Sequence, residues 1–159
     1  MSSESPVSQA LDALGIAHSL HRHTRPLRSL EQAARERGLQ PGQIVRSLLF
    51  RTEGGEFVLV LAAGPAKLDW RRLRRHLGVT RLTTATADEV RTVTGYAPGA
   101  VSPFGLARPL RVLADRGVLA HAQISLGAGI PDAGVLLARD DLLRHVQPEL
   151  GDFVETGTG

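Results

Sequence analysis

The sequence predicts an α+β domain in which helices surround a mixed, mostly antiparallel β-sheet. Two apolar runs, 44–51 and 57–63, have the residue types of central strands and are separated by a Gly-Gly hairpin signal. Capping boxes at Ser29 and Thr86 place helices between the strand-like runs at irregular intervals. This irregular order favours α+β over a regular doubly wound fold.

The first third of the chain is expected to hold two helices and a short strand. Apolar residues at helical spacing in 7–14 predict a helix that ends at Gly15, and 16–22 is strand-like. Ser29 is placed to accept hydrogen bonds from first-turn amides, so a second helix begins there and ends at Gly38.

The middle of the chain is expected to hold the hairpin and a basic helix. Asp69 can cap a helix over 70–77, which ends at Gly78. On this helix Leu73 and Leu77 face one way with Trp70. Four arginines are therefore expected to point outward: Arg71, Arg72, Arg74 and Arg75.

The last third begins with the helix that Thr86 opens, which should run to Thr94. Three strand-like runs follow at 110–114, 122–126 and 135–138. A final helix is expected from Asp140 or Asp141 to about residue 146.

The length of 159 residues is that of one domain. We expect a single domain over 1–159, with its core at about 6–146 and a poorly ordered tail at 147–159. The sequence contains no cysteine, which excludes disulfides, thiolate nucleophiles and cysteine-ligated zinc. Neither a signal peptide nor an apolar run of membrane-spanning length is present, so we expect a cytoplasmic protein with no membrane partner.

The charge is unevenly distributed along the chain. Residues 67–81 hold six basic residues and one acid, whereas 132–159 hold six acids and two arginines. A basic patch suits an anionic partner such as RNA. The arginine-rich usage of a GC-rich genome would give a similar count with no partner, and the sequence does not separate these interpretations.

Two glycine-rich segments are candidates for a binding site. The segment 95–106 contains three glycines, two prolines and Ser102, and the segment 127–134 follows Ser125. Glycine lets the backbone approach a ligand, and proline fixes the chain, so the remaining amides can be aimed at an acceptor. The alternative is an ordinary connector with tight turns. No Gly-x-Ser-x-Gly elbow and no phosphate-binding P-loop motif occurs, which disfavours those enzyme classes.

Three histidines lie close together at 18, 21 and 23. On a strand His21 and His23 share a face, as metal ligands can, but no further ligand has an obvious local source. We therefore expect no metal, and His23 is instead a candidate for lining a pocket. No cofactor is expected.

Three motifs carry a resemblance to a known family. They are Val45-Arg46-Ser47-Leu48, Thr94-Gly95-Tyr96-x-Pro98-Gly99-x-Val101-Ser102-Pro103-Phe104-Gly105 and Ile124-Ser125-Leu126-Gly127-x-Gly129. In this order they resemble the signature of the YbaK-type aminoacyl-tRNA deacylases, a family that includes the editing domain of bacterial prolyl-tRNA synthetases. The resemblance covers about residues 6–146.

The resemblance implies the YbaK editing-domain fold and a free-standing trans-editing hydrolase. Its substrate would be tRNA mischarged with a small amino acid of the alanine, cysteine or proline class, and a prolyl-tRNA synthetase is a candidate partner. It also implies the site. Arg46 and Gly99 take the catalytic positions, and Ser47, Ser125 and Gly127 are candidate substrate-binding residues. His23, from the histidine cluster, and Ala100 and Ser102, from the segment 95–106, complete the candidate substrate-binding residues. The arginines of the basic helix are then candidates for tRNA contact: Arg71, Arg72, Arg74 and Arg75.

Position 46 departs from the family pattern, because the family has a lysine there. A guanidinium group keeps its proton and cannot act as a general base, although it can hold a carbonyl, carboxylate or phosphate oxygen. Two interpretations remain. In the first, Arg46 anchors the substrate while water or the ribose 2′-hydroxyl attacks. In the second, the chain is a non-catalytic module that binds tRNA or an aminoacyl nucleotide and has lost deacylase activity.

Overall fold

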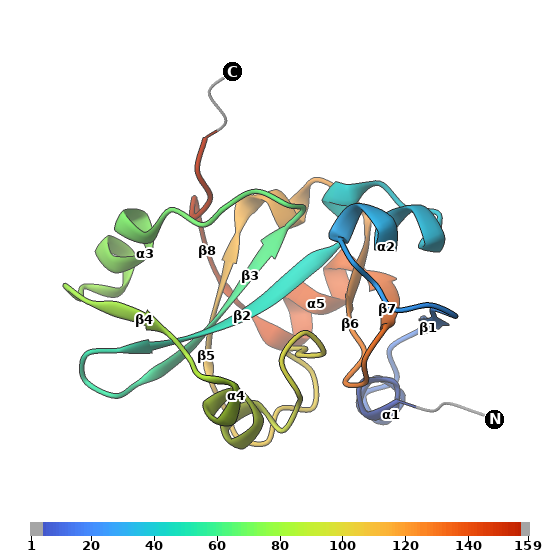
Figure 1. Cartoon of the computed structure of the whole chain (residues 1–159), viewed down its shortest axis with the longest axis horizontal. Helices are drawn as coiled ribbons and strands as arrows, with labels where there is room; N and C mark the ends of the chain where they lie inside the picture. Colours follow the sequence, from blue (N-terminus) through green and yellow to red (C-terminus); the bar gives the residue numbers. More distant parts are fainter. Residues whose placement is uncertain (1–4, 157–159) are drawn as a thin grey trace.

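The structure is a computed structural model and describes residues 5–156 (Figure 1). Within these residues the chain forms the helices α1 (Pro6–Ala13), α2 (Leu30–Arg37), α3 (Trp70–Leu77), α4 (Ala87–Thr94) and α5 (Arg139–Val146). The strands are β1 (His18–Arg22), β2 (Val45–Thr52), β3 (Phe57–Ala63), β4 (Leu82–Thr84), β5 (Arg111–Asp115), β6 (Gln123–Gly127), β7 (Ala133–Ala138) and β8 (Glu149–Gly151). The α+β class with mixed strand directions is confirmed.

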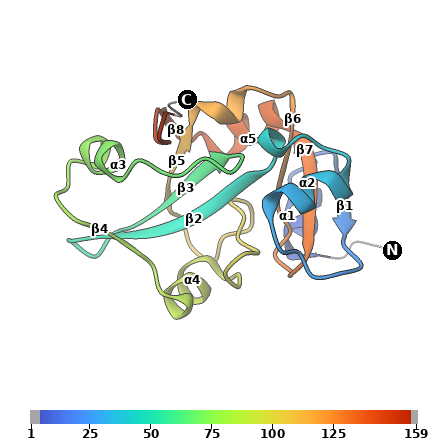
Figure 2. The ribbon, with the colours of Figure 1, turned by 45° about the horizontal axis from the view of Figure 1, so that its top comes forward.

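The strands form two sheets, which Figure 2 shows side by side. The larger sheet has the order β4-β2-β3-β5-β8, with antiparallel pairs at β4-β2 and β2-β3 and parallel pairs at β3-β5 and β5-β8. The smaller sheet, β1-β7-β6, is antiparallel. A single parallel bridge between Ile44 and Ser125 joins the start of β2 to β6. This junction brings the motif on β2 next to the motif on β6.

The larger sheet is covered on both faces, which explains why β3 is apolar along its whole length. Leu59 and Leu61 pack into a core cluster shared with α1, α4, α5 and the smaller sheet. Val58 and Val60 point to the other face and pack with Leu73 of α3 in a second cluster. Because successive side chains of a strand point to opposite faces, neighbouring residues of β3 pack into different core clusters.

The helix starts follow the predicted caps. Ser29, Asp69 and Thr86 each accept a hydrogen bond from the amide three residues further on. Thr86 and Glu89 form the full capping box, because the Glu89 carboxylate accepts from the amide of Thr86 at 2.8 Å. These caps satisfy amides that have no partner inside the helix.

The expectation of a poorly ordered tail is wrong for residues 147–156. Strand β8 pairs with β5, and the side chain of Phe153 is 2% exposed in the second core cluster. The amides of Phe153 and Val154 both donate to the carboxylate of Asp115, at 2.7 and 3.2 Å. Residues 157–159 lie outside the described part of the chain. Burial of the Phe153 ring and the hydrogen bonds to the Asp115 carboxylate hold the segment that follows β8 against the rest of the protein.

Candidate functional site

The segment 95–106 connects α4 to β5 and is held by bonds within itself. The amide of Ala100 donates to the carbonyl of Ala97 at 3.0 Å. Pro98 and Gly99 lie between them, and Gly99 has φ +85°, the arrangement of a type II turn. A Cβ at Gly99 would have no atom within 4 Å, so the backbone angle, and not crowding, requires glycine here. The amide of Gly99 donates to no residue that the structure describes.

The two glycine-rich segments pack against each other. The amide of Gly129 donates to the carbonyl of Ala100 at 2.9 Å. A Cβ on Gly127 would lie 2.4 Å from the carbonyl oxygen of Val101, closer than atoms can approach. Gly127 therefore permits the segment 95–106 to lie directly on the end of β6. Both candidate segments of the sequence analysis therefore lie in direct contact.

Two adjoining cavities open beside this junction. The Trp70 cavity, of about 570 Å³, is bounded mainly by β2, the residues before and at the start of α3, and the start of α4. The Arg37 cavity, of about 500 Å³, is bounded by the end of α2, the start of β2 and the 126–133 turn. They have one wall in common, made of Arg46, Ser47, Leu48, Pro98, Gly99 and Val101. A ligand that spans both cavities at this wall would contact the first two of the three sequence motifs.

Arg46 lies in the shared wall with its guanidinium group partly engaged. Its Nε donates to the carbonyl of Gly64 at 2.8 Å, and its Nη2 donates to the carbonyl of Ala66. Nη1 has no hydrogen-bond partner among the residues described. Burial lowers the pKa of Arg46, but a guanidinium group remains charged. Arg46 therefore fixes the chain between β3 and α3 and keeps one donor edge and a positive charge at the wall.

Ser47 carries a buried hydroxyl without a partner. Its Oγ is shielded from solvent, yet it has no hydrogen bond to any residue of the described chain. Most buried polar atoms in proteins have such a partner. Because Ser47 lines both cavities, a ligand or a water molecule in the shared wall could supply one.

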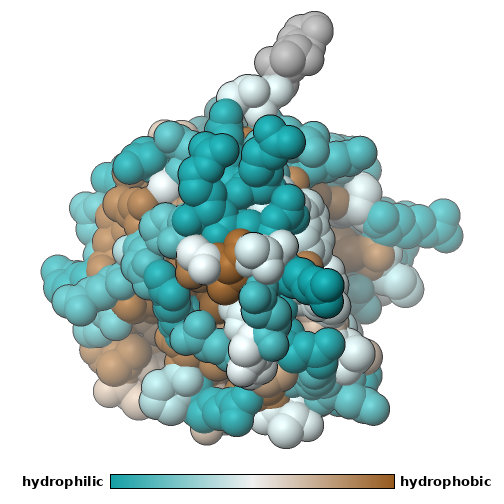
Figure 3. Space-filling model, turned by 90° about the vertical axis from the view of Figure 1, so that its left-hand side faces the viewer, coloured by the Kyte–Doolittle hydropathy of each residue, from teal (hydrophilic) through white to brown (hydrophobic). Residues whose placement is uncertain are grey.

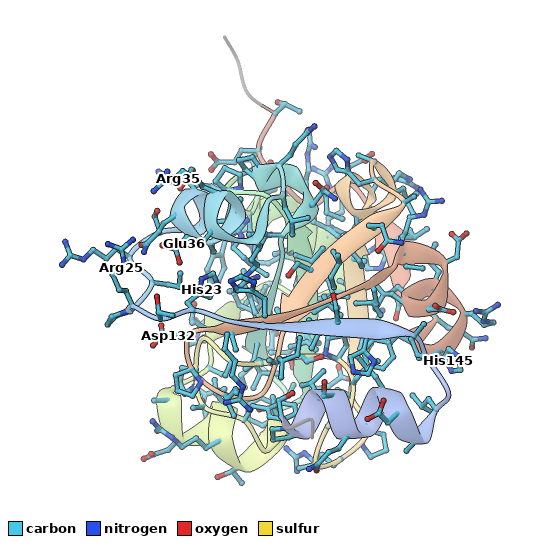
Figure 4. All side chains as sticks on the ribbon, turned by 90° about the vertical axis from the view of Figure 1, so that its right-hand side faces the viewer. His23, Arg25, Arg35, Glu36, Asp132 and His145 are labelled. Atoms are coloured by element: carbon cyan, nitrogen blue, oxygen red, sulfur yellow. The ribbon has the colours of Figure 1, made fainter. Side chains whose placement is uncertain are left out.

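A polar network lies behind the Arg37 cavity. The Arg37 Nε donates to Nε2 of His23 at 2.9 Å, and its Nη1 donates to the hydroxyl of Ser125 at 2.8 Å. The Nδ1 of His23 lies 2.7 Å from the Glu36 carboxylate, so this nitrogen carries the proton when the other accepts from Arg37. Figure 4 shows His23 and Glu36 between α2 and the end of β1, with Asp132 beside them.

Electrostatics in this network follow from burial and hydrogen bonding. Burial is the main cause that lowers the pKa of Arg37, and the nearby Glu36 carboxylate acts in the opposite direction. The pKa of Glu36 is lowered chiefly by the hydrogen bond from Gln32 and then by the one from His23. The network thus holds a charged guanidinium at the cavity wall.

Several of the predicted substrate-binding residues line neither cavity. The side chain of His23 is fully buried in the network, and Ser125 is 1% exposed as the acceptor of Arg37. Ser102 is 0% exposed, and its hydroxyl accepts a hydrogen bond from the amide of Phe104 at 3.1 Å. This hydrogen bond lies within the segment 95–106. Ala100 is also buried, with its carbonyl bound by Gly129. Arg46, Ser47, Gly99 and Gly127 do line the cavities.

The structure adds cavity residues that the sequence motifs did not indicate. Arg37 and Asp132 line one cavity, and Trp70 and Lys67 line the other. Of these four residues, only Asp132 has an unusual backbone conformation, with a φ of +53° in a non-glycine residue. A backbone angle cannot be read from the sequence. Arg37 is the last residue of α2, where a basic residue is ordinary.

The four arginines of α3 differ in their surroundings. Arg71 and Arg75 are exposed, whereas Arg72 and Arg74 are half-buried. The Nε of Arg72 lies 3.4 Å from the carboxylate of the capping residue Asp69. The helix thus presents a basic face beside the Trp70 cavity.

No group of three His, Asp or Glu side chains that could hold a metal ion occurs in residues 5–156. The ring centroids of His21 and His23 lie 4.6 Å apart, but His23 is bound by its own partners. Over the same residues, none of the helices has the length and apolar character needed to cross a membrane.

Comparison with known proteins places these features in a family. Residues 24–145 match the family described as aminoacyl-tRNA editing domain. The multifunctional Ser/Thr-tRNA deacylase ProXp-y of Escherichia coli (strain K12) is 32% identical over 130 residues, which cover 79% of this chain and 78% of that protein. A solved structure described as a candidate trans-editing enzyme for prolyl-tRNA synthetase has a TM-score of 0.87 and 32% identity, covering 95% of this chain and 96% of that one.

Proline–tRNA ligases match over a smaller share of their length. The ligase of Bacillus licheniformis is 34% identical over 110 residues, which are 69% of this chain and 19% of the ligase. The chain therefore spans about a fifth of the length of the proline–tRNA ligases that it matches. The family match, in contrast, extends over most of the present chain and includes all three motifs. This chain belongs to the aminoacyl-tRNA editing domain family, which confirms the resemblance seen in the sequence.

Proposed function

We propose that this chain is an aminoacyl-tRNA deacylase that hydrolyses the ester between a small amino acid and the 3′ end of tRNA. The observation that carries the proposal is the shared wall, where two cavities meet at Arg46, Ser47 and Gly99. An aminoacyl ester has two dissimilar halves joined at one carbonyl. Two cavities that meet at a wall of hydrogen-bond donors suit such a molecule.

The chemistry at the wall is positioning and charge stabilisation. The amide of Gly99 and the Nη1 of Arg46 are donors that can face the oxyanion that develops on the ester carbonyl. Arg46 cannot take a proton, so the nucleophile is a water molecule held next to the carbonyl by binding. Its attack forms the carboxyl group of the amino acid, and the proton it releases passes to the departing ribose 3′-oxygen. Gly99 acts through its backbone, and Ser47 offers the hydroxyl that lacks a partner within the described chain.

The Arg37 cavity suits the amino acid half. Its lining includes the carboxylate of Asp132, which complements the α-ammonium group of an aminoacyl ester, and the apolar side chains of Leu27 and Ile44. Alanine, cysteine and proline are the residues we propose as substrates. The E. coli relative is named for serine and threonine, so these two belong in any test.

A panel of mischarged tRNAs tests the proposal. Purified protein is incubated with tRNAs carrying alanine, cysteine, proline, serine or threonine, and the fraction of ester remaining is followed with time. We expect faster deacylation of at least one of them than in buffer. An unchanged ester lifetime on every tRNA at high protein concentration would overturn the proposal.

The alternative function is a non-catalytic module that binds tRNA or an aminoacyl nucleotide. It is favoured by one observation: two of the three guanidinium nitrogens of Arg46 already donate to backbone carbonyls, which leaves fewer donors for the ester. Saturable tRNA binding together with an unchanged ester lifetime would select this function. The relatives that carry the domain within a proline–tRNA ligase make such a synthetase the candidate partner for either function.

A further inference from the structure

We propose that the Trp70 cavity receives the terminal adenosine of the tRNA, with its base against Trp70. The inference rests on the proposed function, because it assigns the nucleotide half of the same ester. It adds a site for which neither the motifs nor the relatives' names give a role.

The composition of the Trp70 cavity suits a nucleobase. Its lining is largely apolar and includes Leu48, Leu68 and Val90. Trp70 stands at the start of α3 and the residue is 37% exposed. Its ring makes an edge-to-face contact with Phe50, at a centroid distance of 5.1 Å and an angle of 85°, which holds it in place. A fixed aromatic ring that stays accessible is a platform on which a nucleobase can stack. Figure 3 shows hydrophobic residues among hydrophilic ones on the side of the molecule where α3 and β4 lie.

The charge around the Trp70 cavity suits a phosphate group. Lys67, the single lysine of the sequence, lines it, and Arg71 and Arg75 lie exposed on the helix that Trp70 begins. A nucleotide that stacks on Trp70 would carry its phosphate into these basic surroundings. Glu155 also lines the cavity, and its carboxylate can accept a hydrogen bond from an exocyclic amino group such as that of adenine. The cavity thus combines a base platform with a phosphate-binding rim.

The Trp70 cavity and the Arg37 cavity meet at the shared wall. The Trp70 cavity reaches the shared wall at Arg46, Ser47 and Gly99, on the far side of which lies the Arg37 cavity. If the amino acid occupies the Arg37 cavity, the ribose that bears it must lie at the wall. The base attached to that ribose then enters the other cavity. The only tryptophan of the sequence therefore reports on this occupancy.

The experiment uses that single tryptophan as its probe. Fluorescence of the full chain is titrated with an uncharged tRNA that has an intact 3′ end and with the same tRNA lacking its terminal adenosine, while binding of both is measured by filter retention. We expect the intact tRNA to quench Trp70 in a saturable way and the shortened tRNA to bind with at most a small change in fluorescence. AMP should quench as well, at least tenfold more effectively than UMP.

A pair of variants on α4 locates the effect. Ala87 lines the cavity and is exposed, so Ala87→Phe fills the cavity mouth without disturbing the core. Thr92 is exposed on the same helix and does not line the cavity, so Thr92→Phe is the matched control. We expect Ala87→Phe to weaken AMP quenching at least tenfold and Thr92→Phe to change it less than twofold.

The outcomes separate this inference from the proposed function. Equal quenching by the two tRNAs, no quenching by AMP at millimolar concentration, or equal effects of the two variants would each overturn the adenosine site, even if the protein deacylates tRNA. Quenching that depends on the terminal adenosine, in a protein that hydrolyses none of the mischarged tRNAs, would uphold the site and remove the deacylase function.

Discussion

Gly127 lies so close to Val101 that a single added methyl group would be 2.4 Å from the Val101 carbonyl oxygen. This contact joins the end of β6 to the segment that carries Gly99, and both glycines line the shared wall or the Arg37 cavity beside it. The position of the segment 95–106 therefore depends on a glycine outside it. A substitution there tests the coupling directly.

Gly127→Ala is expected to move the 95–106 segment and to lower the free energy of unfolding by about 1–3 kcal/mol, as overpacking does. Deacylation should fall with it, because Gly99 shifts relative to Arg46. Urea unfolding and the mischarged-tRNA assay provide the measurements. Gly54→Ala is the control, since a Cβ there would make only an ordinary 3.9 Å contact. If Gly127→Ala proved as stable and as active as Gly54→Ala, the contact would not hold the loop in place.

Arg46→Ala is expected to leave the protein folded and to slow deacylation by roughly 100- to 1,000-fold, the range seen when an oxyanion donor is removed. Arg51→Ala is the control on the same strand, because Arg51 pairs with Glu89 and lines neither cavity. The test measures initial deacylation rates on the best substrate of the panel, together with thermal unfolding of each variant. An unaltered rate in a folded Arg46→Ala protein would remove Arg46 from the mechanism.

Local features of the chain were predictable because their causes are local. Ser29, Asp69 and Thr86 cap helices through amides three residues away, so a short sequence pattern contains the whole interaction. The β2–β3 hairpin is likewise defined by its own turn. The pairing of β5 with β8 joins segments more than thirty residues apart, and no local signal marked it.

Site residues that act through the backbone could be predicted from the sequence. Residues whose role depends on which partner the side chain contacts were harder to predict. Gly99 and Gly127 were identified because glycine has few roles other than close approach or unusual backbone angles. A serine in a glycine-rich loop can face a ligand or bond to its own backbone, and the structure shows the second for Ser102. Arg37 lines the cavity because α2 packs beside β6 and β7. This contact joins segments that are far apart in the sequence, so no local pattern indicates it.

The basic face of α3 is expected to bind tRNA through its phosphates. A triple variant, Arg71→Gln with Arg74→Gln and Arg75→Gln, should weaken tRNA binding and flatten its salt dependence by up to about 0.9 in log–log slope for each phosphate that is no longer neutralised. Arg72 is kept, because it pairs with the helix cap Asp69. Filter-binding titrations at several salt concentrations provide the slope.

The control for that triple variant removes the same charge elsewhere, with Arg91→Gln, Arg108→Gln and Arg144→Gln, all exposed and outside α3. We expect a smaller decrease in affinity from this set. Identical slopes and affinities for the two triple variants would show that net charge, and not the α3 face, attracts the tRNA.

The ion pair between Glu149 and Arg111 is expected to make stability depend on acid pH. Hydrogen bonds from Arg111, at 2.7 and 2.9 Å, are the main cause that lowers the pKa of Glu149 to about 2. Because the folded pKa lies below the unfolded value of 4.5, the contribution is fully present above pH 4.5 and is lost as the pH falls toward 2. The Glu149 side chain is 41% exposed, so solvent limits the contribution to a few tenths of a kcal/mol up to about 1 kcal/mol.

Urea unfolding of wild type and Glu149→Gln at pH 7, 4 and 3 measures this contribution. The difference in unfolding free energy between the two proteins should be largest at pH 7 and shrink at pH 3, and Arg111→Gln should show the same trend. High salt should reduce the difference at pH 7. A constant difference across the three pH values would mean that the carboxylate charge does not stabilise β8 against β5.

Ser47 and Ser125 both carry buried hydroxyls beside the Arg37 cavity. Removal of the hydroxyl should change the free energy of unfolding differently at the two positions. Ser125 accepts a hydrogen bond from Arg37, so Ser125→Ala leaves a buried guanidinium nitrogen without its acceptor and should cost about 1–3 kcal/mol of stability. Ser47 has no partner in the described chain, so Ser47→Ala should leave the unfolding free energy unchanged within about 0.5 kcal/mol or raise it. The same change should lower kcat/KM several-fold, because the hydroxyl is then missing when the ester occupies the shared wall. Denaturant unfolding and deacylation kinetics on the two variants form the test. If Ser47→Ala destabilised the free protein as much as Ser125→Ala, the hydroxyl would have a structural role and would not be held for the substrate.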